Sequence, residues 1–373
     1  MTTTPFLRKL PQLIFLLAVA AISGCSGGDR RPPATGKEGV ITVVMSNPAW
    51  GGPVGDAVRA ELGKPIQTLP LPEPAFDLEQ YDLTTSDLFR KVIKKRKYIL
   101  FAASLDEESN VAKYIRSGIN DSTLAHIRAG ESGIMKRPNA WYRKQLVVYA
   151  IAPTQEDLIK QITERGEDLR YVFNESTRER LTDRMFERME QTDLEDTLMD
   201  HHDFTVNVQH DYFIAQDTLN FVRLRRVLSD TWRDMFIYYI ENANPNLITE
   251  DWILATRDSL TEKLVRGSWD SSYVEIDRRR PITSENINFL GRYGFETRAL
   301  WHMTKDAMGG PVLNYTFYDE KQRRIYMIDG MVFAPNFDKR EFLRQVEVVA
   351  YTFRTRQDEE MAGTDKSEKG KKS

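Results

Sequence analysis

The sequence predicts an α+β fold with mixed, largely antiparallel sheets and flanking helices. Hydrophobic residues make up 41% of the chain, charged residues 29% and aromatic residues 10%, which is typical of a globular protein rather than a disordered one. In the first half, apolar runs alternate with stretches of helical periodicity. In the second half, strand-like runs separated by short polar turns dominate. The similar alternation of strand-like and helical segments in the two parts also suggests two related halves.

The first half is expected to contain three apolar strands, each linked to a helix. A long charged helical region follows them and starts at the capping-box-like pair Thr154 and Asp157. A similar pair, Ser176 and Glu179, predicts a division of that region near residue 174. The expected strands are 40–45, 98–103 and 145–152, and the expected helices lie near 56–62, 86–93 and 110–119.

The second half is expected to form a mainly antiparallel sheet closed by a final helix. A weak internal echo links it to the first half, because the pairs Ala152-Pro153 and Ala334-Pro335 each end an apolar strand and precede a helix. This echo would fit an ancient duplication of an α+β unit. The expected strands are 204–208, 221–225, 235–240, 273–279, 295–303, 312–318 and 324–334, with helices at 249–265 and 339–353.

The first 24 residues have the features of a signal peptide. Arg8 and Lys9 precede an apolar stretch over 10–22, which ends in Ser23-Gly24-Cys25. A membrane-spanning helix needs about 20 apolar residues, whereas this stretch has the length and the positive flank of a signal sequence. The ending resembles a lipobox, the motif after which bacterial lipoproteins are cut and acylated. The resemblance implies a mature chain that begins at Cys25 and carries acyl chains such as palmitate there.

The remaining chain divides by composition. Cys25 is the only cysteine, so no intramolecular disulfide is available. Each buried methylene of an acyl chain contributes about 0.8 kcal/mol, so a multiply acylated protein stays on the membrane. We expect a flexible tether over 25–37, an N-terminal α+β half over 38–200, a C-terminal half over 201–356 and a disordered tail over 357–373.

Charge and motifs exclude several functions. The net charge of −3 and the sequence pI near 6.1 give no electrostatic basis for nucleic-acid binding. The glycine-rich segment 50–55 lacks the spacing of a phosphate-binding loop, and Pro53 removes a backbone donor from it. No SxxK motif occurs, and the GxSxG spacing is met only at residues 24–28, which overlap the lipobox-like ending. We therefore assign no catalytic residue and no cofactor from the sequence.

A cluster of histidines and aspartates contains side chains that can bind a metal. His201, His202 and His210 lie close together with Asp200 and Asp203. Imidazoles and carboxylates are zinc ligands, but adjacent histidines point in different directions on a regular element, and no HExxH frame accompanies them. The sequence alone therefore predicts a polar junction between a helix and a strand here, and no metal site.

The densest polar pattern lies in the strand predicted around residues 293–303. Alternation places Glu296, Arg298 and His302 on one face and leaves Ala299 and Trp301 on a face suited to a core. The polar face is either a general acid–base site or an ion-pair ladder that holds a sheet surface in register. The ladder is the favoured interpretation, because isolated charge pairs on sheet surfaces are common.

Several segments accompany the lipobox. They are LPLPEP at 69–74, GRYGFETRALW at 291–301, MGGP at 308–311 and FAP at 333–335. Together they resemble a lipoprotein family of the Bacteroidota that is known only as a domain of unknown function. The resemblance implies a location in the cell envelope and a fold shared over nearly the whole mature chain, but no substrate. The sequence departs from that pattern at Ala299, where the family has glycine.

Two functions from different classes remain open. The favoured one is a non-catalytic binding or scaffolding module that is attached to the membrane through its lipid, with another envelope protein, a glycan or a lipid as partner. The alternative is a hydrolase of envelope material that uses carboxylates such as Glu73, Glu296 or Asp329. No acidic run follows Cys25, so we expect an outer-membrane location that faces the periplasm.

The lipoprotein hypothesis predicts that Cys25→Ala abolishes acylation, because the substitution removes the only thiol to which a lipid can be attached. Metabolic labelling with a fatty-acid analogue measures this directly. Labelling of the variant at the level of the unaltered protein would contradict the hypothesis.

Overall fold

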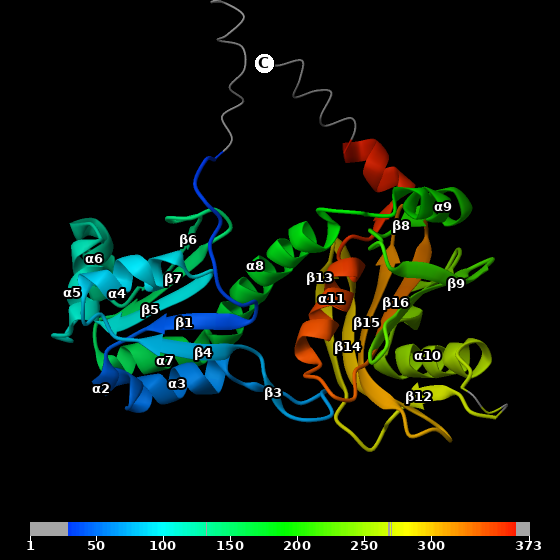
Figure 1. The fold of residues 1–373 in the computed structure, drawn as a ribbon, viewed down its shortest axis with the longest axis horizontal. Coiled ribbons are helices and arrows are strands. Elements are labelled where there is room, and N and C mark those ends of the chain that lie inside the picture. Colours follow the sequence, from blue (N-terminus) through cyan, green and yellow to red (C-terminus); the bar gives the residue numbers. More distant parts are fainter. Residues whose placement is uncertain (1–28, 132, 268, 270, 363–373) are drawn as a thin grey trace, which may run out of the picture.

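The computed structural model describes residues 29–362 apart from residues 132, 268 and 270, and it contains two layered units side by side (Figure 1). The predicted signal peptide and Cys25 lie outside the described residues. Both helices and sheets are abundant, so the α+β class predicted from the sequence is confirmed. Across the part of the chain that is described, no helix combines the length and the hydrophobicity needed to cross a bilayer.

A five-stranded sheet in the order β4-β1-β5-β7-β6 forms the centre of the first unit. Four of its strands are parallel, in contrast to the largely antiparallel pairing expected, because helices connect them and return the chain to the same end of the sheet. The strands are β1 (Val40–Val44), β4 (Asp77–Tyr81), β5 (Tyr98–Ser104), β7 (Leu146–Ala152) and the antiparallel β6 (Gly133–Pro138).

Helices cover both faces of this sheet, which makes the first unit a three-layer structure. N-cap side chains start many of them: Ser109 and Thr154, for example, each accept a hydrogen bond from the backbone N–H three residues on. One face carries α3 (Pro53–Leu62), α7 (Gln155–Glu164) and α8 (Gly166–Phe186), and the other carries α4 (Ser86–Lys91), α5 (Asn110–Ser117) and α6 (Asp121–Arg128).

The break between α7 and α8 lies at Arg165, and the division predicted near residue 174 is wrong. A Cβ at Gly166, the first residue of α8, would lie 2.1 Å from the Glu61 carboxylate of α3, so a larger residue there would have to displace that side chain. Ser176 and Glu179 lie inside the continuous helix instead of capping a new one.

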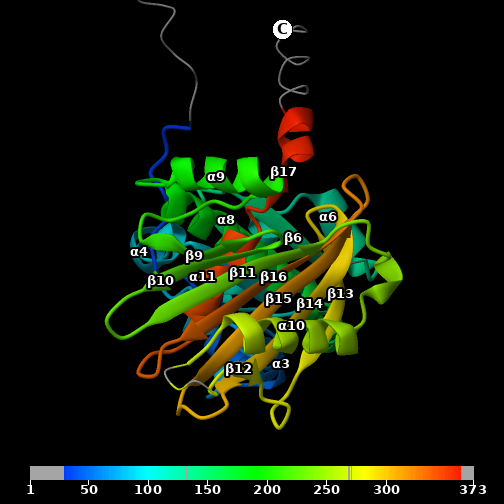
Figure 2. The same cartoon turned by 90° about the vertical axis from the view of Figure 1, so that its right-hand side faces the viewer.

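An antiparallel eight-stranded sheet forms the second unit, in the order β12-β14-β15-β16-β11-β10-β9 with β13 also paired to β14. Figure 2 shows α10 across the near face of this sheet and α11 behind it. The strands are β9 (Tyr212–Thr218), β10 (Phe221–Val227), β11 (Trp232–Ile240), β12 (Val274–Ile276), β13 (Thr283–Phe289), β14 (Arg292–Met303), β15 (Gly309–Asp319) and β16 (Arg324–Phe333). The helices are α9 (Thr192–His202), α10 (Glu250–Leu264) and α11 (Arg340–Ala350).

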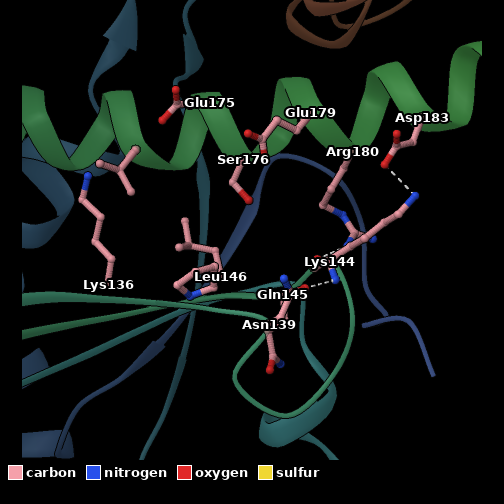
Figure 3. A pocket seen from close by; sticks show the side chains of 12 residues that line it. Lys136, Asn139, Lys144, Gln145, Leu146, Glu175, Ser176, Glu179, Arg180 and Asp183 are labelled. Carbon is pink, nitrogen blue, oxygen red and sulfur yellow. Dashed lines mark hydrogen bonds and ion pairs between the residues drawn. The ribbon is translucent and has the colours of Figure 1, made fainter. Parts of the chain in front are cut away.

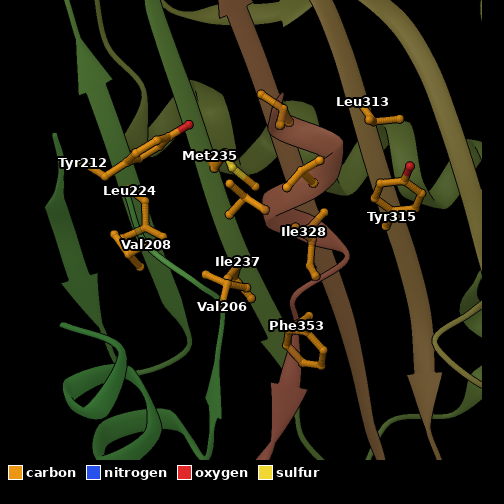
Figure 4. Packing of buried hydrophobic residues seen from close by; sticks show 14 of the residues in the cluster. Val206, Val208, Tyr212, Leu224, Met235, Ile237, Leu313, Tyr315, Ile328 and Phe353 are labelled. Carbon is orange, nitrogen blue, oxygen red and sulfur yellow. The ribbon is translucent and has the colours of Figure 1, made fainter. Parts of the chain in front are cut away.

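The two faces of the second sheet have separate cores. Under α11, buried residues such as Ile237, Ile328 and Phe353 pack together (Figure 4). Under α10, Ala299 and Trp301 of β14 are buried, as the predicted alternation requires. The same alternation sends Glu296 and Arg298 toward the α11 side.

A buried carboxylate joins the two units. Glu73, in β3 (Glu73–Pro74) of the first unit, accepts hydrogen bonds from the backbone N–H groups of Lys339 and Arg340 at 2.7 and 2.8 Å. These groups belong to the first turn of α11, which has no capping side chain of its own. The side chain of Arg340 in turn donates a hydrogen bond to Asp77 of the first unit, so Arg340 donates to that unit through both its backbone and its side chain.

Several expected boundaries differ in the structure. Residues 32–35 lie against the first unit, with Ala34 hydrogen-bonded to Arg143 and Thr35 to Lys95, so the end of the predicted tether is part of the fold. Residues 356–362 are helical, inside the range predicted as a disordered tail, and residues 363–373 lie outside the described part. The strand predicted at 204–208 is reduced to β8 (Phe204–Thr205).

The similarity between the two halves is limited to a strand, the Ala-Pro pair that ends it and the start of the segment that follows. β7 lies between a parallel and an antiparallel neighbour, whereas β16 is antiparallel on both sides. The two sheets also differ in strand order. The halves are therefore related in composition and rhythm but have different topologies.

The position of Trp301 predicts a large loss of stability on truncation. Its side chain is 1% exposed and packs against Trp232 and Phe333. We expect Trp301→Ala to lower the free energy of unfolding by about 3–5 kcal/mol in denaturant melts. Trp269→Ala is the control, because that side chain is 67% exposed and its loss should cost less than about 0.5 kcal/mol. Equal effects of the two substitutions would contradict this packing.

Candidate functional site

A cleft of about 670 Å³ lies where the two units meet. α8 forms one wall, α11 the floor, and the strands β13 and β14 the other wall, so both units contribute. The lining includes six basic side chains and four acidic ones, together with tyrosines and amides. The basic residues are Lys64, Arg170, Arg178, Arg298, Arg340 and Arg344, and the acidic ones are Glu167, Glu285, Glu296 and Glu347.

Glu296 and Arg298, two of the three residues of the predicted polar face, line this cleft. The Nε–H of Arg298 donates to one carboxylate oxygen of Glu296 at 2.5 Å, and the hydroxyl of Tyr315 donates to the other at 2.9 Å. Burial acts to raise the pKa of Glu296, but Arg298 and Tyr315 stabilise the ionised form more strongly, so the pKa lies below its usual value. Glu296 is therefore an ionised carboxylate with both oxygens engaged.

A second charge pair crosses the boundary between the units. Arg178 of α8 lies 3.1 Å from the Glu347 carboxylate of α11. Its guanidinium also stacks over the ring of Tyr351, 3.6 Å from the centroid. Burial raises the pKa of Tyr351 to about 12, so its hydroxyl keeps its proton. This pair fixes the distance between the helices that form the wall and the floor.

The other arginines of the cleft are also paired. Arg344 donates to Glu341 and to the backbone carbonyl of Ala75, both at 2.7 Å, and burial lowers its pKa below the usual value. Arg170 pairs with Glu61 at 2.8 Å. The result is a polar cleft whose positive and negative groups largely balance.

His302, the third residue of the predicted polar face, is not part of the cleft. It lies toward the other end of β14, where its ring is 3.2 Å from the Glu275 carboxylate of β12. Six residues of strand separate it from Glu296, which corresponds to about 20 Å. Alternation predicts the shared face correctly but gives no information about where along the strand a cavity opens.

The remaining carboxylates proposed for hydrolysis have structural roles. Glu73 caps α11 and is 7% exposed. Asp329 is completely buried and bonds to Arg257 at 3.1 Å and Asn314 at 2.9 Å. Burial raises the pKa of Asp329. Neither side chain lines the cleft.

Two further cavities lie in the first unit. A space of about 300 Å³ lies between α8 and the β6–β7 segment, where Lys144 and Asp183 form an ion pair at 2.6 Å (Figure 3). Another, of about 680 Å³, lies beyond the ends of β1 and β5, the position at which parallel sheets often bind ligands. Of these three cavities in the described part of the chain, the cleft between the units is the one that contains residues of the predicted polar face.

The histidine cluster is arranged differently from the sequence expectation. His201 and His202, at the end of α9, both reach the carboxylate of Asp217 on β9, at 3.2 and 2.7 Å. Adjacent side chains can converge here because each contacts a different oxygen of Asp217. Burial acts to raise the pKa of Asp217, but the hydrogen bonds to the two imidazoles lower it by more than burial raises it, so the pKa lies below its usual value. His210 is not a member of this group.

Comparison with family models divides the chain at the boundary between the units. Residues 34–186 match the Domain of unknown function (DUF8532), and residues 191–352 match the Domain of unknown function (DUF4837). Each of the two units is thus similar to one domain of unknown function. Their junction lies at the end of α8, earlier than the boundary predicted at residue 200, and the cleft lies between the DUF8532 and DUF4837 domains.

Comparisons with individual proteins add little. None of the curated proteins matches the chain in sequence. Among solved structures, the Saccharomyces cerevisiae Ran-binding protein Mog1p and a point mutant of Mog1 each match at 8% identity. Each match covers 41% of this chain and 90% of that chain with a TM-score of 0.26, which is too low to support any inference.

The ion pair of Glu296 predicts a pH-dependent contribution to stability. Because its pKa is depressed below the usual 4.5, the contribution is present at neutral pH and is lost as the pH falls through the folded-state pKa. Glu296→Gln leaves Arg298 without its carboxylate, and we expect the free energy of unfolding at pH 7 to fall by about 1–3 kcal/mol. Denaturant melts at several pH values should show that the difference in unfolding free energy between the variant and the unaltered protein becomes smaller at acidic pH.

Glu285→Gln provides the matched control, because Glu285 is an exposed carboxylate on the neighbouring strand and lines the same cleft. Its effect should stay within about 0.5 kcal/mol. A Glu296→Gln variant more stable than the unaltered protein would indicate a strained carboxylate, as catalytic sites often contain, and would contradict the structural role.

Proposed function

We propose that this protein is a lipid-anchored module of the cell envelope that binds a hydroxyl-rich glycan in the cleft between its two domains. The signal sequence, the lipobox-like ending and the single cysteine at position 25 support anchoring at the outer membrane on the periplasmic side. The charge-balanced cleft is the observation that carries the binding role. Concave sites at domain interfaces are common positions for small ligands.

The chemistry of the lining favours a glycan over a strongly charged ligand. Arg178 and Arg298 already have carboxylate partners, so an anion would compete with Glu347 and Glu296 for them. Hydroxyl groups can instead accept from a guanidinium and donate to a carboxylate without separating the pair. The exposed ring of Tyr171, 58% accessible at the cleft, offers a flat surface on which a sugar ring can pack.

Hydrolysis is the second candidate, and the presence of Glu296 and Glu347 in one cleft favours it. Glycosidases use two carboxylates, one of which must hold a proton to act as general acid. The lowered pKa of Glu296 does not suit that role at neutral pH. Binding without hydrolysis is therefore the proposed function.

Substitution of Tyr171 tests the proposal. Calorimetric titration with neutral oligosaccharides released from bacterial envelopes should detect binding by the unaltered protein. We expect Tyr171→Ala to weaken it roughly two- to tenfold, because a lost aromatic contact is worth about 0.5–1.5 kcal/mol. The melting temperature should be unchanged, since the side chain is exposed.

Phe213→Ala is the control, because Phe213 is also exposed but lies on β9, the far edge of the second sheet. Equal affinities of the two variants would exclude the cleft as the binding site. Release of new reducing ends from the oligosaccharides, abolished by Glu296→Gln, would instead establish the hydrolase. If no neutral oligosaccharide binds and the protein instead binds an envelope protein or a lipid, that partner would be the ligand and the glycan proposal would be wrong.

A further inference from the structure

We infer that the junction of α9 and β9 is a binding site for a divalent transition metal such as Zn²⁺, with His201, His202 and Asp217 as its protein ligands. One potential ligand atom from each residue lies within 4.8 Å of the other two. Two imidazoles and one carboxylate form a ligand set that zinc accepts in proteins. The site lies in the DUF4837 domain and does not depend on the glycan proposal.

The two ring nitrogens of His202 face different partners. Nδ1 lies 3.3 Å from the hydroxyl of Tyr239, which itself donates to the carbonyl of Leu219 at 2.6 Å. Nε2 faces the Asp217 carboxylate at 2.7 Å, so Nε2 and Asp217 are placed to bind the same metal ion.

A metal ion bound by Nε2 of His202 and by Asp217 leaves the contact between Nδ1 and Tyr239 in place. His202 is 3% exposed, so it is held in this orientation by its surroundings. The contact between Nδ1 and Tyr239 is also the kind of outer-shell hydrogen bond that orients histidine ligands in metal sites.

The C-terminal end of α9 lies at the site. His202 is the last residue of α9, and Asp203 ends the helix in the left-handed conformation with φ of 61°. The negative end of the helix dipole therefore lies beside the imidazoles and favours a cation there. Arg324 donates to the backbone carbonyl of His202 at 2.9 Å, and its guanidinium is paired with Glu241 at 2.8 Å and stacks on the Tyr239 ring.

The geometry requires only a small adjustment on binding. Bonds of about 2.0–2.1 Å in a tetrahedral zinc site place ligand atoms about 3.3 Å apart. The exposed side chain of His201, 58% accessible, can rotate to meet this distance while the buried His202 stays in place. Three protein ligands leave a position for water or for a fourth group from solvent, so the metal is exchangeable.

Zinc titration of the chelator-treated full-length protein tests the inference, with a chromophoric chelator as competitor. We expect one Zn²⁺ per chain, and Co²⁺ should give the visible absorption bands of a tetrahedral site. His201→Ala and Asp217→Asn should each weaken binding at least about tenfold, and Tyr239→Phe should weaken it by about 10- to 100-fold as an outer-shell change. Because His201 is exposed, its loss should leave the melting temperature of the metal-free protein unchanged.

His210→Ala is the matched control, since it removes a nearby, partly exposed histidine outside the group. Its affinity for Zn²⁺ should equal that of the unaltered protein. The inference is overturned by the absence of stoichiometric binding in the unaltered protein, or by binding that survives His201→Ala and Asp217→Asn. Equal loss in the His210→Ala variant would also overturn it, because binding would then reflect surface histidines in general.

Discussion

The carboxylate of Glu73 holds the two domains in their relative position. Its two oxygens accept the backbone N–H groups that begin α11, which lack any capping side chain from their own domain. Glu73 is buried, so removal of these partners would leave a charge without compensation. The segment that carries it includes three prolines, which keep the backbone extended and limit the ways in which Glu73 can approach the helix.

The cleft depends on this contact because α11 is its floor. Arg340 and Arg344 extend from the same helix to Asp77 and to the Ala75 carbonyl in the first domain. Arg178 reaches back from α8 to Glu347. A change in the angle between the domains would alter the distances within these pairs. The shape of the cleft therefore changes whenever the contact between the domains changes.

The sequence predicts the buried elements well and the exposed ones poorly. The strands β1, β5 and β7 are apolar along their whole length, so periodicity identifies them within a residue or two. The strands β4 and β13 carry mostly half-buried or exposed side chains and have the sequence character of polar segments. Their backbone pairing is decided by the neighbouring strand, and their own side chains carry no signal of it.

The candidate site was only partly predictable for a similar reason. Glu296 and Arg298 were found because they alternate within one strand, but their partners Arg178, Tyr315 and Glu347 come from other elements. Arg178 and Glu347 are 169 residues apart in sequence. The histidine group illustrates the same limit, since Asp217 lies on a strand that its sequence did not reveal, and without it the adjacent histidines had no common partner.

If the chain is anchored to a membrane through Cys25, the docking of residues 32–35 onto the first domain limits the distance between the fold and the bilayer. For a chain anchored at Cys25, seven residues precede Pro32, and seven extended residues span at most about 25 Å. The attachment point lies beside Lys95, Arg96 and Arg143. In such an anchored chain, this face of the first domain would lie within about 25 Å of the membrane.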